Sequence, residues 1–229
     1  MKVKQMSLAK YVGRRILIMT AVEAEREAVL RGLDGDERFD VRLAGVGPAF
    51  AAASTAAALA AAGGSCGLVV SAGIAGGFPS RAEIGSLVVS SRIVAADLGA
   101  ETPDGFASVD ALGFGSAEAQ PDEALAQQLV QALEAAGLRA ACGPILTVST
   151  ATGTAQTAAL LAERVPGAAA EGMEGYGVAV AARQFGVPAL ELRAVSNAVG
   201  PRDRAAWRIP DALLALADGM AILKEVLPR

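Results

Sequence analysis

The chain has 229 residues, of which 53% are hydrophobic and 19% charged, a length that suits one compact domain. Its formal charge of −4, without a basic block, excludes an electrostatic nucleic-acid surface, because neutralising phosphates takes clustered Lys and Arg. The chain has no histidine, which excludes His-based triads, imidazole bases and His-ligated metals, so acid–base chemistry falls to carboxylates, Tyr, Lys or Cys.

Strand-like and helix-like patterns alternate along the whole chain. The predicted strands are 15–22, 39–44, 68–71, 84–96, 145–149 and 189–196. The predicted helices are 23–32, 49–62, 122–137, 154–164, 175–186 and 210–226. Between them, glycine-rich 73–77 predicts a turn, and 99–120 and 197–208 predict loops. Strands separated by helices indicate βαβ units and an α/β fold with a mostly parallel or mixed sheet.

We expect residues 15–229 to form a single domain and residues 1–14 to be a poorly ordered N-terminal extension. The apolar run 16–22 is too short for a signal peptide and leads directly into charged residues. No segment reaches the roughly 18 apolar residues of a membrane span. Cys66 and Cys142 form no CxxC motif, which favours reduced thiols and a cytoplasmic protein. Because no membrane span is predicted, we expect no membrane partner.

Two glycine clusters invite a nucleotide-binding interpretation. Neither Gly45-x-Gly47 nor Gly73-x-x-Gly76-Gly77 completes GxGxxG, because Phe50 stands where the first cluster needs its third glycine. Tight turns at strand ends are therefore favoured over dinucleotide binding. A glycine after a buried strand still lets a ligand approach the backbone, and α/β sheets bind ligands at the carboxyl ends of strands.

Four polar residues lie where an ordinary core would not place them: Glu25, Glu174, Arg193 and Asn197. For Glu25, a solvated helix surface is as good an explanation as function, and Glu174 suits a helix N-terminus through the dipole. Arg193 interrupts a predicted buried strand and needs a buried acceptor, because an unpaired buried charge is very costly. Together they indicate a pocket with two carboxylates, one fixed cation and one amide.

Four segments fall in an order and spacing that resembles the purine nucleosidase/phosphorylase superfamily over residues 15–227. These segments are Ala21-Val22-Glu23-Ala24-Glu25, Ser71-Ala72-Gly73-Ile74-Ala75-Gly76-Gly77, Gly172-Met173-Glu174-Gly175 and Arg193-Ala194-Val195-Ser196-Asn197. The chain is most similar to the methylthioadenosine/S-adenosylhomocysteine nucleosidase branch and, within it, to the futalosine hydrolases of menaquinone biosynthesis. The resemblance implies a three-layer α/β fold, with a central twisted mixed sheet flanked by helices, and a reaction that needs no metal and no cofactor.

The resemblance also implies roles in cleaving an N-ribosidic bond. Glu25, aided by Arg193, orients and deprotonates a water, while Glu174 accepts hydrogen bonds from the ribose hydroxyls and Met173 packs on the sugar. Gly73, Ile74 and Ser196 complete the substrate-binding set. Ile74 replaces a serine that helps to hold the water in the aminopurine branch, so backbone groups of the glycine segment are expected to substitute. Gly172 likewise replaces an acidic residue of that branch.

Asn197 is the substitution that bears on specificity. The aminopurine nucleosidases have Asp here, which protonates purine N7 and accepts a hydrogen bond from the 6-amino group. Asn has no such proton, but its NH₂ suits a 6-oxo oxygen and its carbonyl suits N7–H, a pattern complementary to hypoxanthine. The alternatives are a purine nucleoside phosphorylase, a 6-aminopurine nucleosidase, and a non-catalytic nucleoside-binding module.

Futalosine carries an aromatic carboxylate on the 5′ side of its sugar. Arg202 or Arg204 is a candidate partner for the carboxylate, and Trp207 or Phe78 for the ring; a solvated loop and ordinary packing explain these residues equally well. Related nucleosidases form homodimers, so we expect a homodimer or higher homo-oligomer. The segment 99–120, with Phe106 and Phe114, covers either its own pocket or a partner's.

Overall fold

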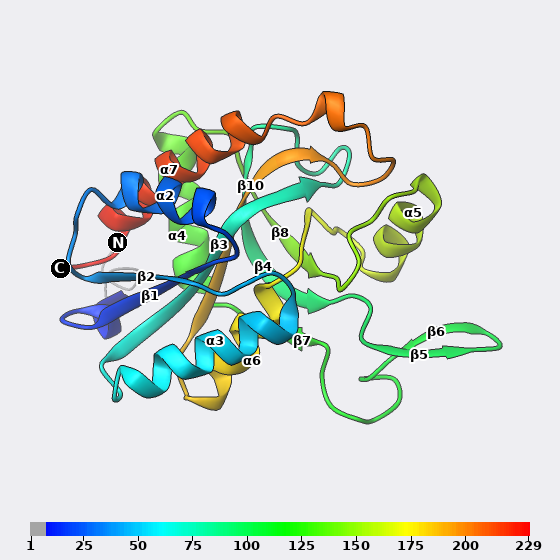
Figure 1. The fold of residues 1–229 in the computed structure, drawn as a ribbon, viewed down its shortest axis with the longest axis horizontal. Coiled ribbons are helices and arrows are strands. Elements are labelled where there is room, and N and C mark those ends of the chain that lie inside the picture. Colours follow the sequence, from blue (N-terminus) through cyan, green and yellow to red (C-terminus); the bar gives the residue numbers. More distant parts are fainter. Residues whose placement is uncertain (1–7) are drawn as a thin grey trace.

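The computed structural model describes residues 8–229, and its helices cover both sides of a central sheet (Figure 1). The α-helices are α2 (Glu23–Leu33), α3 (Pro48–Ala61), α4 (Glu123–Ala135), α5 (Ala155–Arg164), α6 (Gly175–Gln184) and α7 (Ile209–Val226), with short 3-10 helices η1 (Ala9–Tyr11) and η2 (Arg204–Ala206). The strands are β1 (Arg15–Thr20), β2 (Phe39–Leu43), β3 (Cys66–Gly77), β4 (Leu87–Ala95), β5 (Gly99–Thr102), β6 (Gly105–Ser108), β7 (Glu118–Ala119), β8 (Ala140–Thr147), β9 (Ala170–Gly172) and β10 (Ala189–Ala198). Each predicted strand and helix overlaps an observed one.

The main sheet is mixed and partly closed. Its strands follow the order β10-β4-β8-β9-β3-β1-β2, and β7 pairs with β4. Because β10 also pairs with β3, the strands β3, β10, β4, β8 and β9 form a closed ring, while β1 and β2 extend it as an open parallel sheet. A small apolar cluster that includes Val88, Ile145 and Val195 belongs to the ring strands. The predicted mixed sheet is therefore confirmed, with a closure that the sequence pattern did not indicate.

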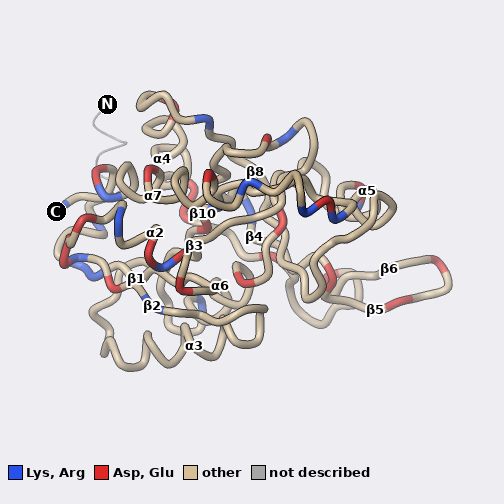
Figure 2. Tube along the Cα trace, turned by 45° about the horizontal axis from the view of Figure 1, so that its top comes forward, with Lys and Arg blue, Asp and Glu red and all other residues tan. Residues whose placement is uncertain are grey.

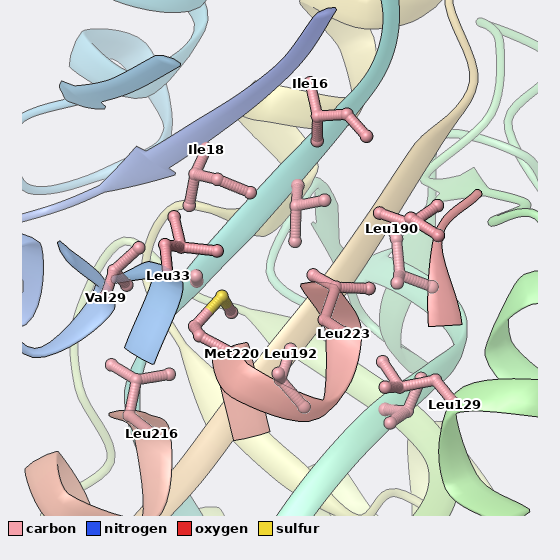
Figure 3. Packing of buried hydrophobic residues seen from close by; sticks show 14 of the residues in the cluster. Ile16, Ile18, Val29, Leu33, Leu129, Leu190, Leu192, Leu216, Met220 and Leu223 are labelled. Carbon is pink, nitrogen blue, oxygen red and sulfur yellow. The ribbon is translucent and has the colours of Figure 1, made fainter. Parts of the chain in front are cut away.

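The two faces of the sheet pack against different helices, and alternate residues of each strand point to opposite faces. Ile16 and Ile18 of β1 belong to the large core cluster with α2, α4 and α7, which Figure 3 shows around Met220. Leu17 and Met19 of the same strand pack instead with α3 and α6. This period of two is the geometry of a strand that is buried on both sides, and it produces three layers of helix, sheet and helix.

The predicted glycine turn at 73–77 is wrong, because β3 continues through it to Gly77. Residues 73–77 run parallel to β10, with Gly73 opposite Arg193 and Gly76 opposite Asn197. These glycines have no positive φ, so they are not needed for a turn. A Cβ on Gly77 would lie 2.4 Å from a backbone oxygen, so here glycine permits close packing. The predicted loop 99–120 also differs, since it contains the β5–β6 hairpin, which extends away from the sheet (Figure 1).

The predicted N-terminal extension falls partly outside the described residues, which begin at Leu8. Residues 8–14 differ from the prediction of poor order, since Leu8 and Tyr11 are buried in the core cluster. The Tyr11 hydroxyl donates a hydrogen bond to Asp122, which also pairs with Lys10. Acidic and basic residues both occur in most parts of the fold, whereas α3 carries neither (Figure 2). In the part of the chain that is described, no helix is both long and apolar enough to cross a membrane.

Candidate active site

A cavity of about 260 Å³ lies where β1, β3, β9 and β10 end. It brings together six of the eight residues predicted for the site. The lining residues from that set are Glu25, Ile74, Met173, Glu174, Ser196 and Asn197. Gly73 and Arg193, which complete the set, do not line the cavity, and Arg193 is only 1% exposed. The strand carboxyl ends therefore form one pocket, as expected for an α/β sheet.

Glu25 is held by the backbone at the start of α2. Its Oε1 accepts a hydrogen bond of 2.9 Å from the Ile74 amide, and its Oε2 accepts one of 2.9 Å from the Ala21 amide. Burial raises the pKa of this carboxyl, against the opposing effects of the nearby Arg193 charge and the amide donors. Because the Ile74 amide already donates to Glu25, it supports the carboxylate instead of replacing the missing serine as a ligand for water.

Arg193 lies behind the pocket wall at the centre of a buried polar cluster. Its Nε donates to Glu191 Oε1 at 2.8 Å, and its Nη2 donates to Glu174 Oε2 and to Ser71 Oγ, both at 3.1 Å. A Cβ at Gly73 would lie 2.5 Å from Glu25 Oε1 and 2.7 Å from Arg193 Nη1. The bare glycine therefore lets the guanidinium act on Glu25 across a short gap, without a direct ion pair among the described contacts.

Glu191 is a member of this cluster that the sequence analysis missed. It is fully buried and burial raises its pKa, although Arg193 opposes that effect. A Cβ on Gly175 would lie 2.1 Å from Glu191 Oε2, so the first residue of α6 has to be glycine. The signal was present: Glu191 and Arg193 are two residues apart on one strand, which places them on one face and supplies the acceptor that a buried Arg requires.

Asn197 closes the opposite side of the cavity at the end of β10. Its carbonyl oxygen accepts a hydrogen bond of 2.8 Å from the Ser196 hydroxyl, and its NH₂ donates to the Ala198 carbonyl at 3.0 Å. Ser196 is buried, and the Ala75 carbonyl at 3.2 Å is the alternative acceptor for its single hydroxyl proton. The half-buried carboxamide is thus held by its neighbours at the edge of the pocket.

A second missed carboxylate, Glu171, lies on β9. Its Oε1 accepts a hydrogen bond of 2.9 Å from the Thr152 amide, and its Oε2 accepts one from the Thr152 hydroxyl. Burial raises the pKa of Glu171, while both Thr152 donors oppose the rise. Both residues line the same cavity as Asn197. The three-residue strand β9 has too short a pattern for the sequence to reveal it.

The structure separates the residues considered for the 5′ side of a nucleoside. Arg202 and Trp207 line the cavity, with the guanidinium carbon 5.1 Å from the centre of the indole ring. Arg204 does not line it, and Phe78 packs in a separate apolar cluster near α5. Phe106 of the β5–β6 hairpin is covered by the Arg164 guanidinium at 3.6 Å, so it too is away from the pocket.

Residues 18–223 match the phosphorylase superfamily. The futalosine hydrolase of Streptomyces coelicolor is 55% identical over 230 residues, covering 93% of this chain and 96% of that one. The native structure of Helicobacter pylori futalosine hydrolase superposes with a TM-score of 0.80 at 18% identity, covering 93% of this chain and 98% of that one. The 5′-methylthioadenosine/S-adenosylhomocysteine nucleosidase of Neisseria meningitidis, in complex with methylthio-immucillin-A, gives a TM-score of 0.79 at 19% identity, covering 92% and 98%.

These comparisons agree with the fold. The superposed structures share the three-layer arrangement, which confirms the predicted fold class. The family match spans nearly the whole domain. The 55% identity to the Streptomyces coelicolor enzyme is more specific, because it points to one group of enzymes within the superfamily. The chain therefore belongs to the phosphorylase superfamily and, within it, to the futalosine hydrolase family.

Proposed function

We propose that this protein hydrolyses the N-ribosidic bond of futalosine, releasing hypoxanthine and dehypoxanthine futalosine for menaquinone biosynthesis. The observation that carries the proposal is that the Glu25 carboxylate and the Asn197 carboxamide line one cavity. The C1′–N9 bond breaks with its electron pair moving to the purine, and a water oxygen bonds to C1′. Glu25 takes the proton of that water, and the purine gains a proton from solvent at N7, because the amide of Asn197 has none to transfer.

The other residues of the cavity serve the sugar. Glu174 accepts hydrogen bonds from the ribose hydroxyls, and Met173 packs against the ring. Glu25 and Glu174 also stabilise the positive charge that develops on the ribosyl group, since fixed anions in a desolvated site act strongly on a developing cation. Arg193 positions Glu174 through its hydrogen bond of 3.1 Å, and from behind the wall its charge acts to lower the pKa of Glu25, against the larger effect of burial.

The charge of the cavity favours a hydrolase over a phosphorylase. Three carboxylates line it, those of Glu25, Glu171 and Glu174, whereas Arg202 is the sole Lys or Arg among the lining residues in the described chain. A phosphate dianion would be repelled there. The test is to incubate the purified protein with futalosine, inosine and methylthioadenosine in phosphate-free buffer and identify the base released. Release of hypoxanthine that requires added phosphate would overturn the proposal.

We expect Asn197→Asp to move the preference toward 6-aminopurine nucleosides. Asp loses the NH₂ that donates to the 6-oxo oxygen and gains an acceptor for a 6-amino group, so the ratio of futalosine to aminofutalosine cleavage falls about tenfold or more. Competition between the two substrates measures the ratio directly. An unchanged ratio in a folded variant contradicts this use of Asn197.

We expect Arg202→Ala to raise KM for futalosine about 3- to 10-fold without changing KM for inosine, because inosine has no 5′ carboxylate to pair with an exposed guanidinium. Arg204→Ala is the matched control, since Arg204 is also exposed but does not line the cavity. If Arg202→Ala changes KM for both substrates by the same factor, the proposed contact between Arg202 and the substrate carboxylate is contradicted.

We place the protein in the cytoplasm as a homodimer or higher homo-oligomer. Both cysteines are free, which supports a reducing compartment. Val46 at the cavity is 52% exposed, and Phe50 and Phe114 are 69% and 81% exposed, which supports a covering partner. No residue of 99–120 lines the cavity of its own chain, so this segment is proposed to reach a partner's pocket.

A further inference from the structure

Glu171 is a buried carboxylate that the proposed hydrolysis does not use. It is 8% exposed and lines the cavity, away from the Glu25 end where water is activated. The two donors that point at it both come from Thr152, one to each oxygen. A carboxylate oxygen has two lone pairs, so each oxygen keeps one for a ligand. The local donors are already engaged, and this part of the wall therefore presents an acceptor.

The sheet places Glu171 in one row with Asn197. Asn197 of β10 is the register partner of Gly76 of β3, and Gly76 is in turn the partner of Glu171 of β9. The two backbones are therefore about 10 Å apart, twice the spacing of neighbouring strands. Gly76 between them carries no side chain, and a Cβ there would lie 2.9 Å from a methyl group of Val199 and 3.4 Å from the Asn197 Nδ2. The part of the cavity over Gly76 is therefore bordered by the Val199 methyl and the Asn197 amide, and Glu171 supplies an acceptor on the far side of Gly76.

A 6-oxopurine presents N7, O6 and N1–H in that order along one edge. An amide at N7 and O6 leaves N1–H as the next polar group, and N1–H is a donor that needs an acceptor when it is buried. Adenine has an unprotonated N1 at the same place, so its lone pair would face the carboxylate. An acceptor in this position therefore discriminates between the two bases, because it makes a favourable contact with the 6-oxopurine and repels adenine.

We propose that Glu171 determines specificity by accepting a hydrogen bond from N1–H of the 6-oxopurine, with Thr152 holding its carboxylate in place. This inference rests on the proposed function, because it assigns the base end of the same cavity. Asn197 then binds N7 and O6 of the purine, and Glu171 binds N1–H. The amide of Thr152, which would otherwise be free to donate to an unprotonated N1, is occupied by Glu171 at 2.9 Å.

The test compares Glu171→Gln with Glu191→Gln, the same change at a buried carboxylate that does not line the cavity. For Glu171→Gln, kcat/KM for futalosine is expected to fall about 5- to 150-fold, because one of the two acceptor oxygens becomes an NH₂ that cannot accept from N1–H and leaves this buried donor unpaired. The value for aminofutalosine is expected to hold or rise, since the Gln NH₂ suits an unprotonated N1. Glu191→Gln is expected to change both substrates by the same factor. The proposal is overturned if the ratio of kcat/KM for futalosine to kcat/KM for aminofutalosine changes by the same factor in both variants, or changes in neither.

Binding of the free base to the unaltered protein gives a second measurement that needs no folded variant. Calorimetry is expected to show hypoxanthine binding at least about tenfold more tightly than 1-methylhypoxanthine, which has no N1–H. Equal affinities would overturn the role of Glu171 even if futalosine is cleaved. If futalosine is not cleaved but hypoxanthine is preferred, the function fails and the role of Glu171 stands.

Discussion

Replacing Glu25 with Gln is expected to lower kcat for futalosine hydrolysis by about 10²- to 10⁴-fold, the usual contribution of one general base. Gln keeps the shape of the side chain and an oxygen to accept from the Ala21 or Ile74 amide, but it cannot take a proton from water. KM should change much less, because the purine and the sugar are held by other residues. Steady-state kinetics on the folded variant measures both constants.

The dependence of the rate on pH provides the control. Burial raises the pKa of Glu25 above the ordinary glutamate value, and only the ionised carboxylate accepts a proton. The kcat/KM of the unaltered enzyme should therefore decline on acidification at a higher pH than an ordinary glutamate would give. This decline should be absent from the residual rate of Glu25→Gln. If Glu25→Gln retains the full rate, or shows the same decline on acidification as the unaltered enzyme, Glu25 is not the general base.

Replacing Arg193 with Met is expected to destabilise the protein by about 3–5 kcal/mol, because it leaves the fully buried Glu191 without its partner. For a chain of this size such a loss lowers the Tm by roughly 6–20 °C. Activity should fall as well, since Glu174 loses its hydrogen bond of 3.1 Å to the guanidinium. Thermal unfolding followed by circular dichroism gives the Tm.

The double variant Arg193→Met with Glu191→Leu separates the structural effect from the catalytic one. An apolar pair of similar volume is expected to recover most of the lost stability, because replacing both buried charges removes their desolvation cost. Activity should stay low, since Glu174 and Glu25 remain without the cation. If the double variant is no more stable than Arg193→Met alone, Glu191 is not the group that Arg193 neutralises.

Much of the fold followed from the sequence because the hydrophobic periods are long enough to distinguish strands from helices. One error has its physical origin in glycine. Gly73 and Gly76 were assigned to a turn, yet they serve close packing against β10 and the cavity. Glycine serves both purposes, and only the neighbours in space decide between them.

The site was predicted unevenly for a related reason. Glu25 and Asn197 follow strands that the sequence identifies clearly, so the resemblance placed them in one pocket, and the structure does the same. Glu191 was within reach, because an Arg in a buried strand requires an acceptor and Glu191 lies two residues away. Glu171 was not, since its position depends on a three-residue strand and on pairing with Gly76, which no local pattern encodes.

The guanidinium of Arg193 has its acceptors in place before any substrate arrives: Glu191, Glu174, the Ser71 hydroxyl and the Ile74 carbonyl. Water would have to turn its dipoles toward a growing charge during each catalytic cycle, whereas these groups were oriented when the chain folded. The free-energy cost of orienting these groups therefore arises when the chain folds and does not recur in each catalytic cycle. Successive turnovers therefore meet charged groups that are already in place around the pocket.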